Sequence, residues 1–462
     1  MTEQAALKNG PIVWLSRPNI AAAYLGLLLM FGGGGTPAPL SELICQLIAA
    51  LALAVWVVAA PAKDMSRPVQ VAKIAALLIV PVALQLVPLP PQIWHALPGQ
   101  ESVQAALALV GKEENWKPLS IAPHRSFAAL LSLLPPLIAL AMTAMLPPRH
   151  RGVLIGTIAL GGLLSALVGA GQLAGSGTGP LQFYNEGEAG ILFGFQANRN
   201  AEADVLMIGL LAVAAIWGGL SKPRRSAPLG FAFAALAALL VLATILTASR
   251  TGIALLPIAL CFAVLLGRPN LATQWRLSRL WQGGLGLAGL GVLVLTLWRN
   301  QAISRVLARF DFVGEYRPDL WHDTLFAIRQ YWPLGSGLGT FVPAIYPAER
   351  LEAIGAALPN RAHNEVLELA LEGGLPLMLA WTVAGILVAR ALWRALRGTS
   401  GVPREHAWFA AGTLLLTGLH SMVDYPFRSM ALATLIGVAA GLVMVSSNGT
   451  AKPGPARADE VK

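Results

Sequence analysis

Two histidines stand where apolar stretches of the sequence begin or end. His363 lies in the segment Arg361–Glu365, just before one apolar stretch, and His420 closes another, with Asp424 four residues further on. A spacing of four places His420 and Asp424 on one face of a helix. Imidazole is the usual general acid or base near neutral pH, so both histidines are candidates for proton transfer. The alternative for each is a helix cap or an ordinary polar contact.

Arginines form the second group of candidates. Arg199, Arg250 and Arg428 are isolated in short segments, and Arg317 lies in a longer segment that contains arginines and acids but no lysine. A guanidinium binds phosphate or carboxylate through two parallel hydrogen bonds, which an ammonium cannot do. One such residue at a membrane boundary usually extends to lipid headgroups. Several at one face favour a shared anionic ligand.

Polar residues also follow His363 directly. The polar residues Asn364, Glu365, Glu368 and Glu372 form a stripe, because the acids are three and four positions apart. Acids in a first turn complement the helix dipole, which would be a structural role. Glu372 lies deeper, where an ionisable residue inside a membrane is by default functional or partnered.

Several chemical signatures are missing from the sequence. It has no HExxH, Walker A or nucleophile-elbow motif, and no Asp-x-Asp pair in the segments expected outside the membrane. The cluster Gly335–Gly339 has the wrong spacing for a phosphate loop, and we interpret it as a turn. We therefore expect no metal and no cofactor.

The composition places these residues in a membrane protein. Of 462 residues, 56% are hydrophobic and 12% charged, against roughly 25% charged in soluble proteins. The net charge of +10 is typical of loop bias in a protein with many spans, and no basic patch interleaved with aromatics suggests nucleic acid. Cys45 and Cys261 lie in apolar stretches, so no disulfide framework is expected.

We expect an all-α fold with about 12 transmembrane helices, each needing about 20 apolar residues. The expected spans are approximately 20–35, 42–60, 71–88, 127–146, 153–174, 202–220, 229–247, 252–267, 283–298, 366–389, 408–422 and 430–446. Residues 1–298 would hold helices 1–9, residues 299–363 a large outer loop, residues 364–447 helices 10–12, and residues 448–462 a disordered tail. Lys and Arg are concentrated in the loops on one side, which predicts that both termini lie in the cytoplasm.

The order of these motifs resembles the O-antigen ligase and polymerase superfamily over roughly residues 190–375. The resemblance rests on Ser249-Arg250-Thr251-Gly252, on Arg317 and Trp321, on the segment Pro333–Phe341, and on His363-Asn364, Leu367 and Glu372-Gly373. Residues 1–174 match it in hydropathy alone.

The resemblance implies a function at the periplasmic face of the bacterial inner membrane. A glycan would pass from an undecaprenyl diphosphate carrier to an acceptor hydroxyl, which in ligases belongs to the lipid A core. The family's diphosphate-binding arginines correspond to Arg250 and Arg317, and its essential histidine to His363. Arg199 is a third candidate for binding the diphosphate, although it stands where the family often has Asn. Possible supporting residues are Asn364, Arg361, Glu372, His420 and Asp424.

The chemistry of the candidate residues fits that reaction. Fixed arginines can stabilise the charge that develops on a leaving diphosphate without a metal. His363 can accept the proton of the acceptor hydroxyl. With no obvious carboxylate nucleophile, a single displacement with inversion is expected.

Three alternatives remain open from the sequence. Within the superfamily the protein could be an O-antigen or exopolysaccharide polymerase, which the segment His420–Pro426 resembles, or a protein O-oligosaccharyltransferase. From another class, it could be a twelve-helix secondary transporter. No internal repeat is evident, and the polar candidates gather at one membrane face instead of the midplane.

Overall fold

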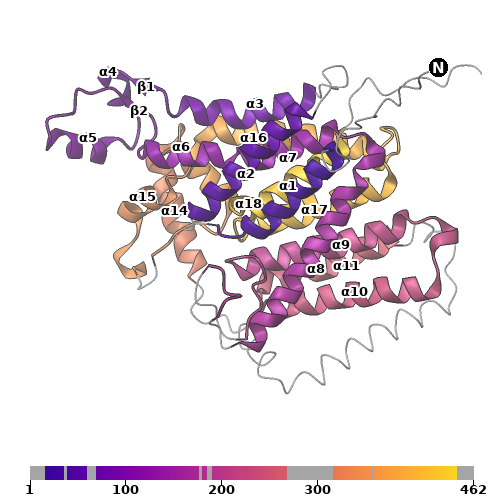
Figure 1. Cartoon of the computed structure of the whole chain (residues 1–462). Helices are drawn as coiled ribbons and strands as arrows, with labels where there is room; N and C mark the ends of the chain where they lie inside the picture. The colour runs from indigo at the N-terminus through magenta and orange to yellow at the C-terminus, as the bar shows by residue number, and fades with distance from the viewer. Residues whose placement is uncertain are drawn as a thin grey trace, which may run out of the picture.

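The computed structural model describes residues 16–35, 39–59, 69–175, 179–184, 190–267, 316–354 and 358–444. Within these ranges the chain is mostly helical (Figure 1). The strands found there are β1 (Pro88–Leu89) and β2 (Lys117–Pro118), which pair antiparallel. The expected span at 283–298 and the expected tail at 448–462 lie outside the described residues.

The helices agree with the hydropathy pattern. The apolar helices are α1 (Arg17–Phe31), α2 (Pro39–Val58), α3 (Val69–Leu84), α6 (Pro123–Ser132), α7 (Leu134–Met145), α8 (Gly152–Ala174), α9 (Arg199–Gly219), α10 (Ala227–Leu246), α11 (Arg250–Gly267), α16 (Glu365–Leu396), α17 (Arg404–His420) and α18 (Met430–Val443). The other α-helices are α4 (Pro91–Trp94), α5 (Glu101–Ala108), α14 (Arg317–Tyr331) and α15 (Phe341–Ile345).

Seven segments of the described chain are long and apolar enough to cross a membrane. They are α2, α6 together with α7, α8 with the turn before it, α9, α10, α11 and α16. Three shorter apolar helices, α1, α3 and α18, accompany them. These helices indicate a membrane protein with several spans, while the count of twelve and the division at residues 298 and 364 stay predictions.

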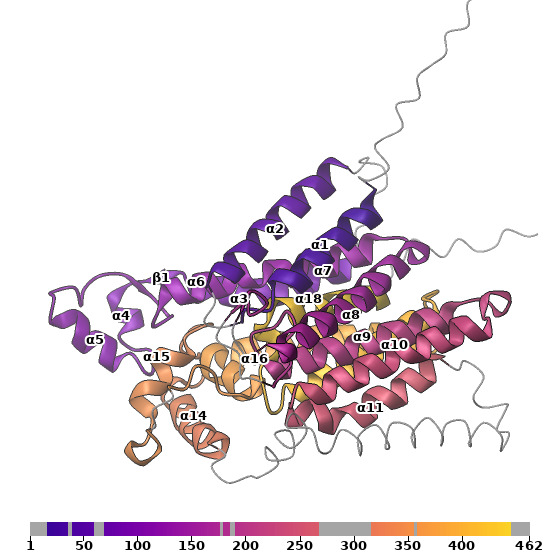
Figure 2. The same cartoon turned by 60° about the horizontal axis from the view of Figure 1, so that its bottom comes forward.

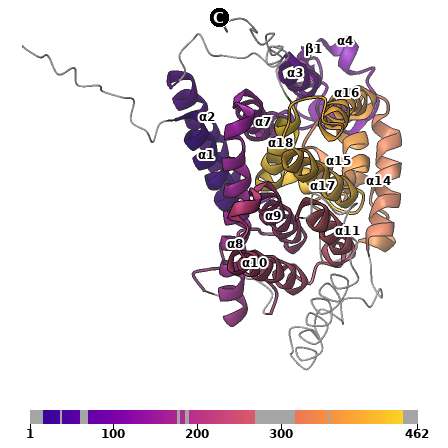
Figure 3. The same ribbon diagram turned by 90° about the vertical axis from the view of Figure 1, so that its right-hand side faces the viewer.

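The most buried of these spans is α9. It packs against α8, α10, α11 and α17, and α18 packs against α7 and α17. Seen along the bundle, α9, α17 and α18 lie in the middle, with α2 and α14 toward opposite sides (Figure 3). Small residues permit the close crossing of α8 and α9, since a Cβ on Gly162 would come within 3.1 Å of the Gly209 Cα.

Connecting segments from distant parts of the sequence meet at one end of the bundle, which we call the site end. The Ala431 and Ala197 amides donate to the Gly32 and Gly33 carbonyls at 3.0 and 2.8 Å. These bonds join the segment after α1 to the segment before α9 and to the first turn of α18. At this end, on the left of Figure 1, α14 and α15 lie below the projecting unit formed by α4, α5 and the strands, which also projects in Figure 2.

A kink in α16 forms hydrogen bonds with the segment Pro333–Gly337 at the site end. Gly374 has a left-handed φ of 56° inside the helix, which frees backbone groups from the helical pattern. The Leu375 amide donates to the Pro333 carbonyl at 2.8 Å, and the Gly337 amide donates to the Glu372 carbonyl at 2.9 Å. The Gly335–Gly339 segment is thus a turn, as predicted, and it completes the hydrogen bonding of the kinked helix.

Candidate functional site

His363 lies immediately before α16, at the site end. Asn364 caps this helix by accepting hydrogen bonds from the Val366 and Leu367 amides at 3.0 and 3.1 Å. His363 itself has a φ of 49°, a left-handed conformation that is uncommon for any residue other than glycine. The Asn364 cap and the left-handed backbone of His363 together direct the imidazole toward Asp424.

The imidazole of His363 has a partner on each nitrogen. Its Nδ1 lies 3.0 Å from Asp424 Oδ1, and its Nε2 lies 2.7 Å from the Tyr316 hydroxyl. An ionised carboxylate only accepts hydrogen bonds, so Nδ1 carries the proton and Nε2 accepts from the hydroxyl in the neutral ring. His363 therefore has the orientation that a general base needs, with Nε2 directed at a hydroxyl group.

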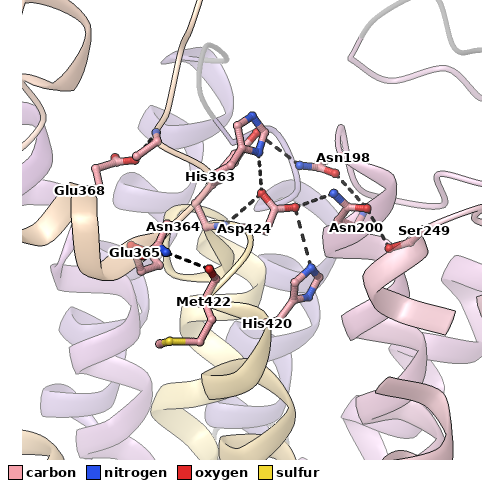
Figure 4. A network of polar contacts seen from close by, with 12 residues as sticks. Asn198, Asn200, Ser249, His363, Asn364, Glu365, Glu368, His420, Met422 and Asp424 are labelled. Carbon is pink, nitrogen blue, oxygen red and sulfur yellow. Dashed lines mark hydrogen bonds and ion pairs between the residues drawn. The ribbon is translucent and has the colours of Figure 1, made fainter. Parts of the chain in front are cut away.

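Asp424 joins His363 to a second histidine (Figure 4). Its Oδ2 accepts a hydrogen bond from Asn200 at 2.5 Å and lies 3.8 Å from His420 Nε2. The expectation that His420 and Asp424 lie together is confirmed. Burial raises the pKa of Asp424, but the hydrogen bond and charge of His363 and the charge of His420 outweigh it, and the pKa lies below its usual range. Asp424 is therefore ionised at neutral pH.

His420 forms a second imidazole–carboxylate pair with a residue that sequence reasoning missed. Its Nδ1 lies 2.7 Å from Asp204 Oδ2, and both side chains are almost completely buried. Asp204 is in the second turn of α9. The sequence did contain a signal for Asp204, because it is an acid that lies a few residues inside an apolar stretch.

A buried charge cluster lies beside the histidines. Arg428 forms ion pairs with Glu372, Glu368 and Glu365 at 2.9, 3.3 and 3.4 Å, and Arg361 pairs with Glu368 at 2.7 Å. Burial opposes the charge of Arg428, but the carboxylates of Glu372, Glu368 and Glu365 raise its pKa. Arg428 thus binds carboxylates of its own chain, and the sequence-based grouping of this residue with an external anion is wrong. Glu372 is a partnered residue.

The other three candidate arginines share a position in their helices. Arg199, Arg250 and Arg317 are the first residues of α9, α11 and α14. A helix N-terminus carries a partial positive charge that adds to that of the guanidinium. Arg317 lies close enough to His420 for its charge to act on that ring.

Ser249, the residue before Arg250, connects the Ser249–Gly252 motif to His363 through hydrogen bonds. Ser249 donates to Asn200 Oδ1 at 2.7 Å, and the Asn200 amide group donates to Asp424. Two hydrogen bonds therefore separate the Ser249–Gly252 motif from the carboxylate that holds His363. Asn200 was also missed by the sequence analysis, because nothing in its local pattern indicates a contact with Asp424.

A cavity of about 460 Å³ opens beside this network. Its walls come from the segments after α1 and before α9, from α9, and from the segment between α17 and α18. They are formed by Gly33, Gly34, Gly35, Tyr184, Phe193, Ala197, Asn198, Arg199, Ala201, Asp204, Asn360, His420, Asp424, Tyr425, Pro426 and Ser429. In the part of the chain that the structure describes, no group of three or more His, Cys, Asp or Glu side chains is arranged to hold a metal ion.

The fold and the site define a helical membrane protein with a polar centre at one end of its bundle. Residues 235–382 match the family model described as O-antigen ligase. This match supports membership of the chain in the O-antigen ligase superfamily, as the motif order predicted, and it supports a ligase or polymerase type of function. The match includes Arg250, Arg317, His363 and Glu372, but not Arg199, His420 or Asp424. No curated protein matches the chain.

Proposed function

We propose that the protein transfers a glycan from an undecaprenyl diphosphate carrier to an acceptor hydroxyl, as O-antigen ligases do. The observation that carries the proposal is the position of the His363 imidazole, which Asp424 holds with its Nε2 directed at the Tyr316 hydroxyl. Arg250 and Arg317 begin their helices at the same end of the bundle. The family match, which covers His363 and both arginines, supports it.

In the proposed reaction His363 is the general base. Its Nε2 removes the proton of the acceptor hydroxyl while the oxygen attacks the anomeric carbon of the donor. The bond between that carbon and the diphosphate oxygen breaks, and undecaprenyl diphosphate leaves with the bonding electrons. Asp424 is a positioning residue, because it fixes the ring and stabilises the imidazolium that forms. One displacement inverts the anomeric centre.

The leaving diphosphate requires cations that are already in place. Arg250 and Arg317, with Arg199 as a third, would bind it and stabilise the charge that develops as the anomeric bond breaks. Each begins a helix, so the helix dipole contributes to the same stabilisation. This arrangement makes the proposed reaction independent of a metal.

The proposed reaction also assigns a side of the membrane. The polyprenyl tail would lie in the bilayer, while glycan and acceptor react in water at the site end. We place this end on the periplasmic side of the bacterial inner membrane, with both termini in the cytoplasm, because Lys and Arg are concentrated in the loops at the other end. The acceptor would be the lipid A core or a similar glycan.

Polymerisation and protein glycosylation would use the same base and the same arginines, so only the acceptor separates them from ligation. A transporter is disfavoured by the position of the buried charges. Asp204, Glu365, Glu368, Glu372 and Asp424 all lie toward the site end, whereas a transporter would hold its substrate near the midplane.

A transfer assay in proteoliposomes tests the proposal. Wild-type protein with a lipid-linked glycan donor should glycosylate one of three acceptors: lipid A core, a second carrier-linked glycan, or a protein. His363→Ala should lower the rate by about 10²- to 10⁴-fold, and Arg250→Ala and Arg317→Ala should also lower it strongly. The matched controls are His322→Ala and Arg329→Ala, two exposed residues of α14, which should retain transfer. Full transfer by His363→Ala and Arg250→Ala would refute the proposed roles.

A further inference from the structure

Two buried polar atoms in the wall of the cavity have no hydrogen-bond partner among the described residues. They are His420 Nε2 and Asp204 Oδ1, and each residue is only 1% exposed. Both residues line the cavity. A buried polar atom without a hydrogen-bond partner destabilises the folded protein, so these two atoms point to a ligand that would satisfy them.

The chemistry of this wall selects the kind of ligand. His420 Nδ1 lies 2.7 Å from Asp204 Oδ2, so Nε2 is the ring nitrogen left for a ligand, as an acceptor in the neutral ring and as a donor in the charged ring. Asp204 Oδ1 is also an acceptor, and Asp424 lies in the same wall with its Oδ2 3.8 Å from His420 Nε2. Two carboxylates beside an imidazole suit a ligand with several hydroxyl groups, because a hydroxyl can donate to a carboxylate and can either donate to or accept from Nε2. The two carboxylates would repel a diphosphate, which offers acceptors and negative charge.

Size and the remaining lining agree with a sugar ring. A volume of about 460 Å³ lies within the range of about 300–1,000 Å³ that is common for small-molecule sites. Tyr184, Phe193 and Tyr425 give the cavity aromatic surface, which can cover the C–H faces of a sugar while its hydroxyls reach the acceptors. Arg199 is a cation in the same wall, so a sugar bound here could place an attached phosphate beside a guanidinium.

We propose that this cavity binds the donor sugar that is attached to the diphosphate, and that His420 and Asp204 form hydrogen bonds with its hydroxyls. The inference rests on the proposed function, because it assumes a glycosyl diphosphate donor. It assigns His420 to substrate binding, separate from the base His363. The second imidazole of the site thus selects for the sugar.

The test compares binding of two probes to the full-length protein in detergent: undecaprenyl diphosphate, and undecaprenyl diphosphate that carries one sugar. Wild-type protein should bind the sugar-bearing lipid more tightly. His420→Asn keeps a donor near Asp204 but removes Nε2, and it should reduce this preference by about 10-fold, the effect of one hydrogen bond of about 1.4 kcal/mol. Asp204→Asn, which keeps the shape of the side chain, should reduce it similarly.

The control is His406→Asn. His406 is a buried histidine of the same helix, in its first turns at the other end, and its variant should keep the wild-type preference. The inference is overturned if wild-type protein shows no preference, if both site variants keep it, or if they change only the KM of the acceptor. A sugar preference that depends on His420, in a protein that transfers no glycan to any acceptor, would instead support the inference and refute the proposed function.

Discussion

Two arginines at opposite ends of the bundle, one fully buried and the other largely buried, show how differently the two ends are built. Arg151, which is 2% exposed, donates five hydrogen bonds of 2.8–3.2 Å to main-chain carbonyls that end α7 and α18. Arg428, at the site end, is surrounded by the carboxylates of Glu365, Glu368 and Glu372. The Arg151 guanidinium satisfies main-chain carbonyls, and the Arg428 guanidinium neutralises carboxylates.

The partners explain what each arginine does. Carbonyls at helix C-termini carry partial negative charge, so Arg151 stabilises the scaffold there and no acid is needed. Arg428 instead permits three acids to remain buried next to His363 and Asp424. The Phe427 amide also donates to Glu365 at 2.9 Å, and the Glu365 amide donates to the Ser421 carbonyl at 2.9 Å. Arg428 therefore helps to hold the segment that carries Asp424 against the start of α16.

The largest effect should come from Arg151→Ala. It removes five donors and leaves buried carbonyls unsatisfied, at a cost on the order of 3–5 kcal/mol. We expect low yield and a strongly lowered unfolding temperature in detergent, with normal transfer per folded molecule. Arg149→Ala, an exposed neighbour, is the control and should unfold like wild type. An unchanged unfolding temperature for Arg151→Ala would contradict its scaffold role.

Arg428→Ala should come next, with a cost of about 3 kcal/mol because buried carboxylates lose their cation. Unlike Arg151→Ala, it should also lower transfer per folded molecule by about tenfold or more, since Asp424 would lose its position opposite His363. Adding Glu372→Gln should restore part of the stability. Strictly additive effects in that double-mutant cycle would mean that Arg428 and Glu372 do not interact.

Asp424→Asn should have a smaller effect on stability, about 1–2 kcal/mol, and this effect should depend on pH. Because the pKa of Asp424 in the folded protein lies below its usual value, its contribution is complete above pH of about 4 and disappears as pH falls through the folded pKa. The difference in unfolding temperature between variant and wild type should be constant from pH 5 to 8 and shrink only below that range. A difference that disappears near pH 6 would assign the titration to a histidine instead.

Tyr316→Phe should have the smallest effect. Its hydroxyl contacts His363 Nε2, where the acceptor hydroxyl would bind, so its removal should change stability by less than about 1 kcal/mol. Transfer should change by no more than about fivefold, which corresponds to about 1 kcal/mol. A loss as large as that of His363→Ala would show that Tyr316 itself takes part in proton transfer.

Much of the fold could be predicted from the sequence, because long apolar stretches have few structural solutions in a membrane. The spacing of His420 and Asp424 placed those two residues together, and Glu372 was expected to be either functional or partnered. Hydropathy could not reveal that Arg151 is buried, since in the sequence it is one of several basic residues in a short segment between two apolar stretches. Its partners are main-chain carbonyls 290 or more residues away as well as nearby ones.

The candidate site was less predictable, because its pairs join distant segments. Asp204 and His420 are 216 residues apart, and Asn200 and Asp424 are 224 apart. No local pattern indicates which acid approaches which histidine. Arg428 looked like Arg199 and Arg250 in sequence, and only the packing of α16 against the segment before α18 shows that its partners are glutamates.

The most direct test of the central claim separates donor binding from transfer in His363→Asn. Both quantities would be measured on the same proteoliposomes, with lipid-linked glycan and an acceptor that the wild-type protein glycosylates. If His363 is the base, donor affinity should stay within about twofold of wild type, while single-turnover transfer should fall by at least about 100-fold. Transfer at the wild-type rate, or a loss explained entirely by weaker donor binding, would contradict the account.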